Sequence, residues 1–423
     1  MKKILILVLC VLVTLTGCNS ADTDTSKDIP TPEITEELAT PQITIQPTPV
    51  GPYSYTDYTA SQQILDDALV YEGNTNRIIA AMQKASRGED IKIGVIGGSI
   101  TWGASADIDK TYAKKLYRWW KKKFPESSIK LVNAGKSGTG SVIGVHRIEQ
   151  DLLSKGVDFV IVEFAVNDTD DEEVIEAYES IIRYVLSHES KPGLMLLMMC
   201  ADEGYSSEDS KIEIGTHYNV PIISYKSSVY AAVERGELVW DEIADDFIHP
   251  DNPGHLLIAE TIIYRLEQYH KHIEDEVDIV IDLPESITDA YYTNVELLTN
   301  ETLNVTSIGG FEKDNNANWV LPLGYKAVDK NNKFAFEVEA KTIVLVYNQL
   351  TNNMGANIFV EVDGVGYGMI TSKSPFEWEA ITSTEILREN SVEKHTITLT
   401  YTDEVPEECT GEEFKLLAVM IGK

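Results

Sequence analysis

Two short segments far apart in the chain carry residue types that could perform acyl transfer. One ends an apolar run with two glycines and Ser99, and the other places Asp246 three residues before His249. A serine hydroxyl becomes an effective nucleophile when a nearby base takes its proton, and a histidine oriented by a carboxylate is suited to that task. The two segments therefore predict a serine esterase, with Ser99 as nucleophile, His249 as general base and Asp246 as the residue that orients the base.

Residues this far apart must be brought together by the fold, and the chain between them alternates strand and helix signals. Strands are predicted at 91–96, 129–133, 157–164, 193–199 and 220–223, and helices at 61–85 with a break around Gly73, 112–124, 172–187 and 253–270. Asp251 or Asn252 is placed to cap the last helix, with Pro253 in its first turn. The alternation predicts an α/β domain whose parallel sheet is covered by helices on both faces.

Two further polar motifs follow neighbouring strands of this predicted sheet. Gly138 lies in the segment after the strand at 129–133, and Asn167 lies just after the strand at 157–164. Ligands of such sheets bind outside the carboxyl ends of the strands, so both motifs should lie near Ser99. A backbone amide at Gly138 and the Asn167 carboxamide are candidate donors to a developing oxyanion, and one such donor is worth about 3 to 4 kcal/mol of barrier. Asp168 is expected to fix this loop by bonding neighbouring backbone.

The four segments resemble blocks I, II, III and V of the SGNH (GDSL-like) hydrolases, in the same order. The resemblance covers about residues 60–273 and implies a flavodoxin-like, three-layer α/β fold. It also implies that the amides of Ser99 and Gly138 and the carboxamide of Asn167 form an oxyanion hole, in addition to the roles given above to Ser99, Asp246 and His249.

The chain departs from the commonest pattern of that family at two places. Gly98 replaces the aspartate that precedes the serine, and Ala165 and Val166 replace a glycine pair. Variants carrying Gly-Gly-Ser-Ile-Thr look like a branch of secreted bacterial carbohydrate esterases. The departures should therefore affect the substrate more than the mechanism.

Other chemistries fit the sequence less well. A metal cluster could be imagined from Asp245, Asp246, His249, Asp251 and His255. No second ligand group with recognisable spacing accompanies them. The Gly-Lys-Ser at 135–137 lacks the first glycine of a phosphate-binding loop, because position 130 is Lys130. We therefore expect neither a metal nor another cofactor, and we interpret His255 as a helix residue that supports the site.

Three aromatic or imidazole side chains lie near the motifs. Trp102 could line the pocket or pack against a helix, and the sequence does not decide between these. For Tyr112 and His146, packing is the favoured interpretation.

The N-terminus indicates where the protein works. Lys2 and Lys3 precede an apolar run at 4–15, which is too short to span a bilayer stably but suits a signal peptide. The segment ending at Cys18 resembles the bacterial lipobox, which implies a lipidated cysteine. We expect a signal peptide at 1–17, a disordered linker rich in Pro and Thr at 18–52, and a chain anchored outside the cytoplasm.

The net charge and the cysteine content restrict the classes of partner and the disulfide bonds that the chain can have. The formal net charge of −33 argues against nucleic acids and anionic lipid surfaces, whereas neutral acylated sugars are compatible with it. After processing, Cys200 and Cys409 remain besides Cys18. Two buried free thiols are expected rather than a disulfide framework. The oligomeric state cannot be read from the sequence.

The predicted catalytic domain at 53–273 is followed by a second domain at 274–423 with alternating, β-branched segments. Strands are predicted at 333–340, 342–347, 357–362 and 395–401, with further candidates at 299–304, 319–323 and 414–421 and a turn at Asp363 and Gly364. These predict a β-sandwich of jelly-roll type. Its aromatic residues could stack on sugar rings or fill its core: Trp319, Tyr325, Tyr347, Tyr367 and Trp378.

Taken together, the sequence predicts a serine esterase that removes acyl groups, expected to be acetyl, from a polysaccharide of xylan or mannan type. The polysaccharide rests on the family resemblance and on the accompanying domain rather than on an assigned residue. Two alternatives stay open. One is an acyltransferase acting on cell-envelope glycans, and the other is a non-catalytic carbohydrate-binding lipoprotein, against which the intact set of motif residues argues.

Overall fold

The computed structural model describes residues 55–289, 291–375 and 379–423. The predicted signal peptide at 1–17, the predicted lipidation site Cys18 and the predicted linker at 18–52 lie outside these ranges. Within them, none of the helices combines the length and the apolar character needed to cross a bilayer.

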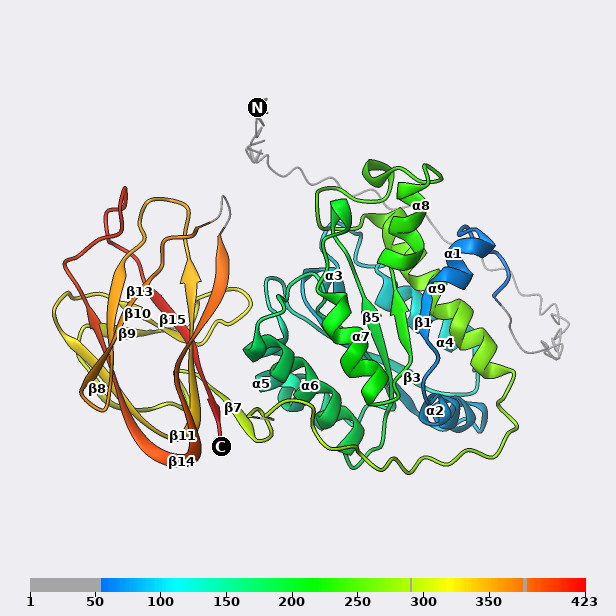
Figure 1. Cartoon of the computed structure of the whole chain (residues 1–423), viewed down its shortest axis with the longest axis horizontal. Helices are drawn as coiled ribbons and strands as arrows, with labels where there is room; N and C mark the ends of the chain where they lie inside the picture. Colours follow the sequence, from blue (N-terminus) through cyan, green and yellow to red (C-terminus); the bar gives the residue numbers. More distant parts are fainter. Residues whose placement is uncertain (1–54, 290, 376–378) are drawn as a thin grey trace, which may run out of the picture. The chain divides into compact units, whose positions relative to one another are not determined.

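The first domain is an α/β structure built on a six-stranded sheet (Figure 1). In spatial order the strands are β1 (Leu69–Tyr71), β6 (Ile222–Ser224), β5 (Gly193–Met198), β4 (Phe159–Glu163), β2 (Ile91–Gly97) and β3 (Ile129–Gly135). Strands β2 to β6 are parallel, and β1 at the edge is antiparallel to β6. The predicted α/β class with a parallel sheet is confirmed.

Helices cover both faces of this sheet because successive residues of each buried strand point to opposite sides. The helices are α1 (Gln62–Asp67), α2 (Asn76–Ser86), α3 (Ser99–Trp102), α4 (Tyr112–Lys123), α5 (Ser141–Asp151), α6 (Glu172–Ser187), α7 (Glu208–His217), α8 (Ala231–Glu234) and α9 (Asn252–His270). Ile93 and Val95 of β2 join an apolar cluster with α1, α2, α4 and α9, whereas Ile96 joins a second cluster with α5, α6 and α7.

The predicted helix at 61–85 with a break around Gly73 is wrong in one respect, since the break contains the short edge strand β1. Gly73 has a φ of +58°, and a Cβ there would lie 2.5 Å from the backbone nitrogen of Pro221. The glycine thus permits a turn packed against the segment that leads into β6. A three-residue strand is too short to produce a periodic signal, which is why the sequence did not reveal it.

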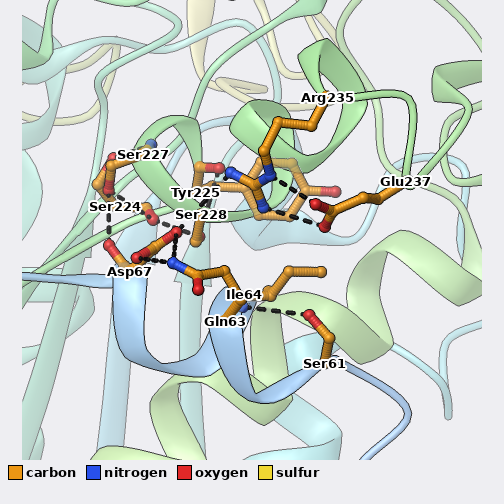
Figure 2. A network of polar contacts seen from close by, with 10 residues as sticks. All are labelled: Ser61, Gln63, Ile64, Asp67, Ser224, Tyr225, Ser227, Ser228, Arg235 and Glu237. Carbon is orange, nitrogen blue, oxygen red and sulfur yellow. Dashed lines mark hydrogen bonds and ion pairs between the residues drawn. The ribbon is translucent and has the colours of Figure 1, made fainter.

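Polar contacts tie α1 to the segment after β6 (Figure 2). The Ser61 hydroxyl caps α1 by accepting from the Ile64 amide at 3.3 Å, and the Ser227 hydroxyl donates to the Asp67 carbonyl at 3.0 Å. Arg235 and Glu237 form an exposed ion pair at 2.6 Å beside them.

Helix α9 closes the domain and anchors its first residues. Asp251 is its N-cap and accepts from the Gly254 amide at 2.9 Å, as one of the two predicted alternatives had it. Further along α9, the buried Glu260 accepts from the amides of Thr59 and Ala60 at 2.8 to 3.0 Å. It also accepts from the Tyr55 hydroxyl at 3.1 Å. One carboxylate therefore holds the beginning of the described chain to the last helix.

The second domain is all-β, and its strands are antiparallel. Their spatial order is β13 (Val365–Thr371), β12 (Asn357–Val362), β14 (Ala380–Tyr401), β11 (Lys333–Gln349), β15 (Lys415–Gly422), β10 (Gly324–Ala327) and β9 (Phe311–Asp314), with β7 (Val295–Leu298) beside β15 and β8 (Asn304–Ile308) beside β11. Its own apolar cluster includes Phe334, Phe336 and Ile397. The predicted β-sandwich class is confirmed.

Details of this domain differ from expectation where side chains favour turns. The predicted strand at 299–304 is largely a turn between β7 and β8, because the buried Asn300 donates to the carbonyls of Asp314 and Gly324. The predicted strand at 319–323 is a loop closed by the Ala317 amide on the Pro322 carbonyl at 3.0 Å. The predicted strands at 333–340 and 342–347 are one continuous strand, β11.

The turn at Asp363 and Gly364 is present, with φ values of 51° and 79°, as a hairpin turn with two left-handed residues requires. Cys200 and Cys409 are free, and Cys200 is buried, but Cys409 is only half-buried.

We expect Glu260→Ala to lower the free energy of unfolding of the α/β domain by about 2 kcal/mol, because it removes a buried acceptor shared by several donors. Urea unfolding followed by tryptophan fluorescence measures this. Glu237→Gln, in the exposed pair with Arg235, is the control and should leave the transition unchanged. An unchanged midpoint for Glu260→Ala would contradict the anchoring role.

Candidate active site

The candidate nucleophile sits where β2 ends and a one-turn helix begins. Ser99 is the first residue of α3 and is 5% exposed. A Cβ at Gly97 would lie 2.4 Å from the Glu163 carbonyl, and a Cβ at Gly98 would lie 1.9 Å from Asn167 Oδ1. Both glycines are therefore required by close approach to the end of β4.

The base and its carboxylate come from the loop that precedes α9. His249 Nε2 lies 2.9 Å from Ser99 Oγ, and His249 Nδ1 lies 2.7 Å from Asp246 Oδ2. With Nδ1 carrying the hydrogen toward Asp246, Nε2 is free to accept the serine proton. The three side chains thus form a continuous hydrogen-bonded chain. The His249 side chain is 24% exposed and that of Asp246 is 53% exposed.

Asp246 is held in place from several sides. Its Oδ1 accepts from the amides of Ile248 and His249, each at 2.7 Å, and Trp240 Nε1 donates to its carbonyl at 2.9 Å. Partial burial raises the pKa of Asp246, but the bonds from the His249 ring and the two amides outweigh burial and leave the pKa below its usual value. The carboxylate is therefore ionised at neutral pH and can stabilise a protonated His249.

The two predicted oxyanion donors follow the strands on either side of β2. In the parallel register, Gly97 of β2 is opposite Gly135 of β3 and opposite Glu163 of β4. Gly138 and Asn167 lie three and four residues beyond those partners. Gly138 has a φ of +69°, and no atom lies within 4 Å of its Cβ position. The sheet thus brings the loops that carry Ser99, Gly138 and Asn167 to one edge.

Asp168 joins the two donor loops. It is buried and accepts from the Ser141 amide at 2.8 Å and from the Ser141 hydroxyl, and Lys211 Nζ lies 3.3 Å from its Oδ2. Ser141 begins α5, directly after the loop of Gly138. Asp168 therefore bonds neighbouring backbone as expected and ties the Asn167 loop to the Gly138 loop.

The remaining polar residues near the motifs are buried or engaged elsewhere. His146 is buried, its Nδ1 lies 2.7 Å from the Val142 carbonyl, and burial lowers its pKa to about 4. His255 accepts from the Tyr112 amide at 3.1 Å, and burial lowers its pKa to about 4 as well. Both rings are neutral at pH 7, and His255 supports the site from α9.

The metal cluster considered for the sequence does not assemble in the part of the chain that the structure describes. The carboxylates there that come close enough to share an ion are Glu172, Glu176 and Asp289, and none of them belongs to the segment at 245–255. Glu176 is buried and pairs with Arg388 of the β domain at 2.6 Å.

The β domain contacts the helix that Ser99 begins and lines a cavity beside Gly138. Trp102 of α3 is 50% exposed, and its ring centroid lies 5.2 Å from that of Trp319, which is 66% exposed. A cavity of about 280 Å³ beside them is lined by Ser137 and Gly138 and by β-domain residues that include Asn348, Glu379, Glu413 and Lys415. Sequence reasoning missed these four residues because only the tertiary structure brings them beside Gly138.

The other aromatic residues proposed for sugar stacking divide into two groups. Tyr325 and Tyr347 are buried in the core of the β domain, whereas Tyr367 is 48% exposed on β13. Trp378 lies outside the described residues. Of the described candidates, Trp319 is the one whose ring contacts the nucleophile helix, through Trp102.

Comparisons with known proteins identify the family that the chain resembles. The profile of the GDSL-like lipase/acylhydrolase family matches residues 95–257. Two crystal structures of a two-domain esterase active on acetylated mannans, one of them co-crystallised with mannopentaose, are similar to the chain at 30% sequence identity. Their TM-scores are 0.78 and 0.79, and each alignment covers 85% of this chain and 98% of the other. The search of curated proteins gave no match.

We expect Asn167→Ala to lower kcat for a small acetyl ester about 100-fold or more with little change in KM, because a donor to the oxyanion acts mainly in the transition state. Steady-state kinetics measures this. Asn76→Ala is the control, since the exposed Asn76 carboxamide donates to the Asp278 carbonyl at 3.0 Å and belongs to none of the catalytic segments. A loss below tenfold for Asn167→Ala would contradict the assignment.

Proposed function

The chain belongs to the GDSL-like lipase/acylhydrolase (SGNH) family, and from this premise we propose that it is a serine esterase that removes O-acetyl groups from a polysaccharide. The observation that carries the proposal is the hydrogen-bonded chain from Ser99 Oγ through His249 to Asp246. Within this class we propose acetylated mannan as the first substrate to test and acetylated xylan as the second.

The geometry supports an acyl-serine route. His249 Nε2 takes the Ser99 proton as Oγ attacks the acetyl carbonyl carbon, and the carbonyl electrons move to its oxygen. The amides of Ser99 and Gly138 and the carboxamide of Asn167 stabilise that oxyanion. Collapse of the intermediate breaks the bond to the sugar oxygen, which takes the proton from His249 and leaves.

The acetyl group then stays on Ser99 until water attacks it. His249 accepts the proton of this water, and the second tetrahedral intermediate collapses to acetate and free serine as His249 returns the proton to Oγ. The His249 side chain is 24% exposed, so water can reach the base.

Mannan is favoured because the similar esterase acts on acetylated mannans and matches this chain over 98% of its own length. The alignment thus includes both domains rather than the catalytic domain alone. The cavity beside Gly138 has polar and charged lining residues, and the exposed rings of Trp102 and Trp319 lie next to it in the fold. Aromatic faces and convergent polar groups suit a sugar chain.

We also propose that Cys18 is lipidated and tethers the enzyme to the outer face of the bacterial cell membrane. The support is the sequence alone, which places a charged start and a short apolar run before the lipobox-like segment. Mass spectrometry of the mature N-terminus, with Cys18→Ser as the comparison, would test this.

The protein is expected to release acetate from acetylated glucomannan, and Ser99→Ala is expected to release none above background while staying folded. Acetate release is measured on acetylated glucomannan, acetylated xylan and their deacetylated forms, and near-UV circular dichroism checks the fold. Equal release by Ser99→Ala would refute the nucleophile assignment. Cleavage of a small acetyl ester with no release from either glycan would refute the polysaccharide substrate.

Trp319→Ala is expected to raise KM for acetylated glucomannan several-fold and to leave kinetics on a small acetyl ester unchanged, because a stacking contact is worth about 1 kcal/mol. Tyr367→Ala, on the exposed side of β13, is the matched control in the same domain. Equal effects of the two variants, or of Trp319→Ala on both substrates, would argue against stacking at Trp319.

A further inference from the structure

A buried chain of hydrogen bonds lies next to the nucleophile and takes no part in the proton transfers. The Thr101 hydroxyl donates to Glu163 Oε2 at 2.8 Å, and the Tyr112 hydroxyl lies 2.9 Å from Thr101 Oγ1. All three residues are fully buried. Since Thr101 gives its only hydrogen to Glu163, the Tyr112 hydroxyl donates to Thr101. The backbone amide of Tyr112 then donates to His255 Nδ1 at 3.1 Å.

These contacts connect the segments that carry the catalytic groups. Thr101 is two residues after Ser99 in α3, and Glu163 ends β4 four residues before Asn167. Tyr112 opens α4, and His255 lies in the first turns of α9, six residues after His249. The nucleophile, an oxyanion donor and the base are thus linked through side chains that do not reach the substrate.

Helix α3 needs such support because it is a single turn. Its few backbone bonds include Trp102 N to the Gly98 carbonyl at 3.0 Å and Gly103 N to the Ser99 carbonyl at 2.9 Å. A helix this short is not stable by itself and depends on tertiary contacts. A small rotation of α3 would lengthen the 2.9 Å contact between Ser99 Oγ and His249 Nε2.

Burying these polar side chains costs desolvation free energy. Burial raises the pKa of Glu163 to about 7, although the Thr101 hydroxyl opposes this rise, and burial also raises the pKa of Tyr112. Apolar residues of similar size would fill the space without this desolvation cost. The position of the Thr101 hydroxyl also requires glycine at residue 97, since a Cβ at Gly97 would lie 2.3 Å from Thr101 Oγ1.

We propose that Thr101, Tyr112 and Glu163 are positioning residues for the esterase reaction, holding α3 so that Ser99 stays aligned with His249 and Asn167. The inference rests on the proposed esterase activity. The three residues act through Ser99, so their loss should lower kcat and leave substrate binding unchanged. Misplacement of a reacting group by a small distance can cost about 100-fold in rate.

The test compares variants of the whole protein on a small acetyl ester and on acetylated glucomannan. Thr101→Val keeps the shape and removes the hydroxyl, and we expect kcat to fall at least tenfold on both substrates with KM within twofold. Thr101→Ser, which keeps the hydroxyl, should restore most of kcat. Tyr112→Phe should also lower kcat, and the double variant should lose less than the product of the two single losses, because the residues share one network.

Matched controls remove buried hydroxyls elsewhere. Thr261→Val removes a buried hydroxyl that bonds the Ile258 carbonyl of α9, and it should leave kcat unchanged. Circular dichroism and thermal unfolding show whether each variant folds. If Thr101→Val does not fold, Tyr112→Phe, which removes a single oxygen, decides the question by the same split between kcat and KM.

The outcomes separate this inference from the proposed function. An active parent whose kcat is unchanged in Thr101→Val or in a folded Tyr112→Phe overturns the positioning role alone. An equal loss in Thr101→Ser and Thr101→Val also overturns it, because the hydroxyl would then be irrelevant. A parent that hydrolyses neither substrate overturns the proposed function, and the inference with it.

Discussion

The close approach of the end of β2 to the end of β4 is the constraint on which the rest of the site depends. The parallel register places Gly97 opposite Glu163, and the two glycines leave room for the Glu163 carbonyl and the Asn167 side chain. A larger residue at Gly97 would collide with the Glu163 carbonyl and push α3 away from β4, and one at Gly98 would displace the Asn167 side chain. The position of Ser99 is thus determined by the sheet. The loops that carry the base and the oxyanion donors place their groups around it.

Separate sets of hydrogen bonds hold the segments that carry those partners. Asp168 connects the Asn167 loop to the start of α5, while Asp251 and His255 fix the beginning of α9 just after His249. Each of these side chains accepts a hydrogen bond from a backbone amide of another segment or of the helix that it caps. The side chains of His249 and Asp246 remain partly exposed, which leaves the base accessible.

The β domain packs against the catalytic domain through both apolar and charged contacts. The apolar cluster of α5 and α6 continues into it through Tyr292, Val344 and Met420, and the Arg388–Glu176 pair crosses the same interface. These contacts hold Trp319 and the polar lining of the cavity near Gly138. In our account the catalytic domain supplies the reaction, and the second domain supplies part of the surface that recognises a long substrate.

Much of this could be predicted from the sequence, and the rest could not for definite physical reasons. The strand and helix pattern predicted the sheet because buried parallel strands are continuous apolar runs, and the motifs predicted Ser99, Gly138, Asn167, Asp246 and His249. The structure brings the loops of these residues to one edge. The strand β1 was not predicted because three residues are too few to show a periodic hydrophobic pattern. The predicted strand at 319–323 was wrong because its polar neighbours favour a closed loop. The buried partnership of Thr101 with Glu163 depends on register between strands, which a single sequence does not encode locally.

The most direct test of the central claim is to look for the acyl group on the nucleophile. The protein is mixed with acetylated glucomannan, quenched in acid within milliseconds and digested, and the peptide that carries Ser99 is examined by mass spectrometry. We predict a transient mass increase of one acetyl group located on Ser99 and absent from Ser99→Ala. Acetate release without such a species, or acetylation at another residue, would contradict the account.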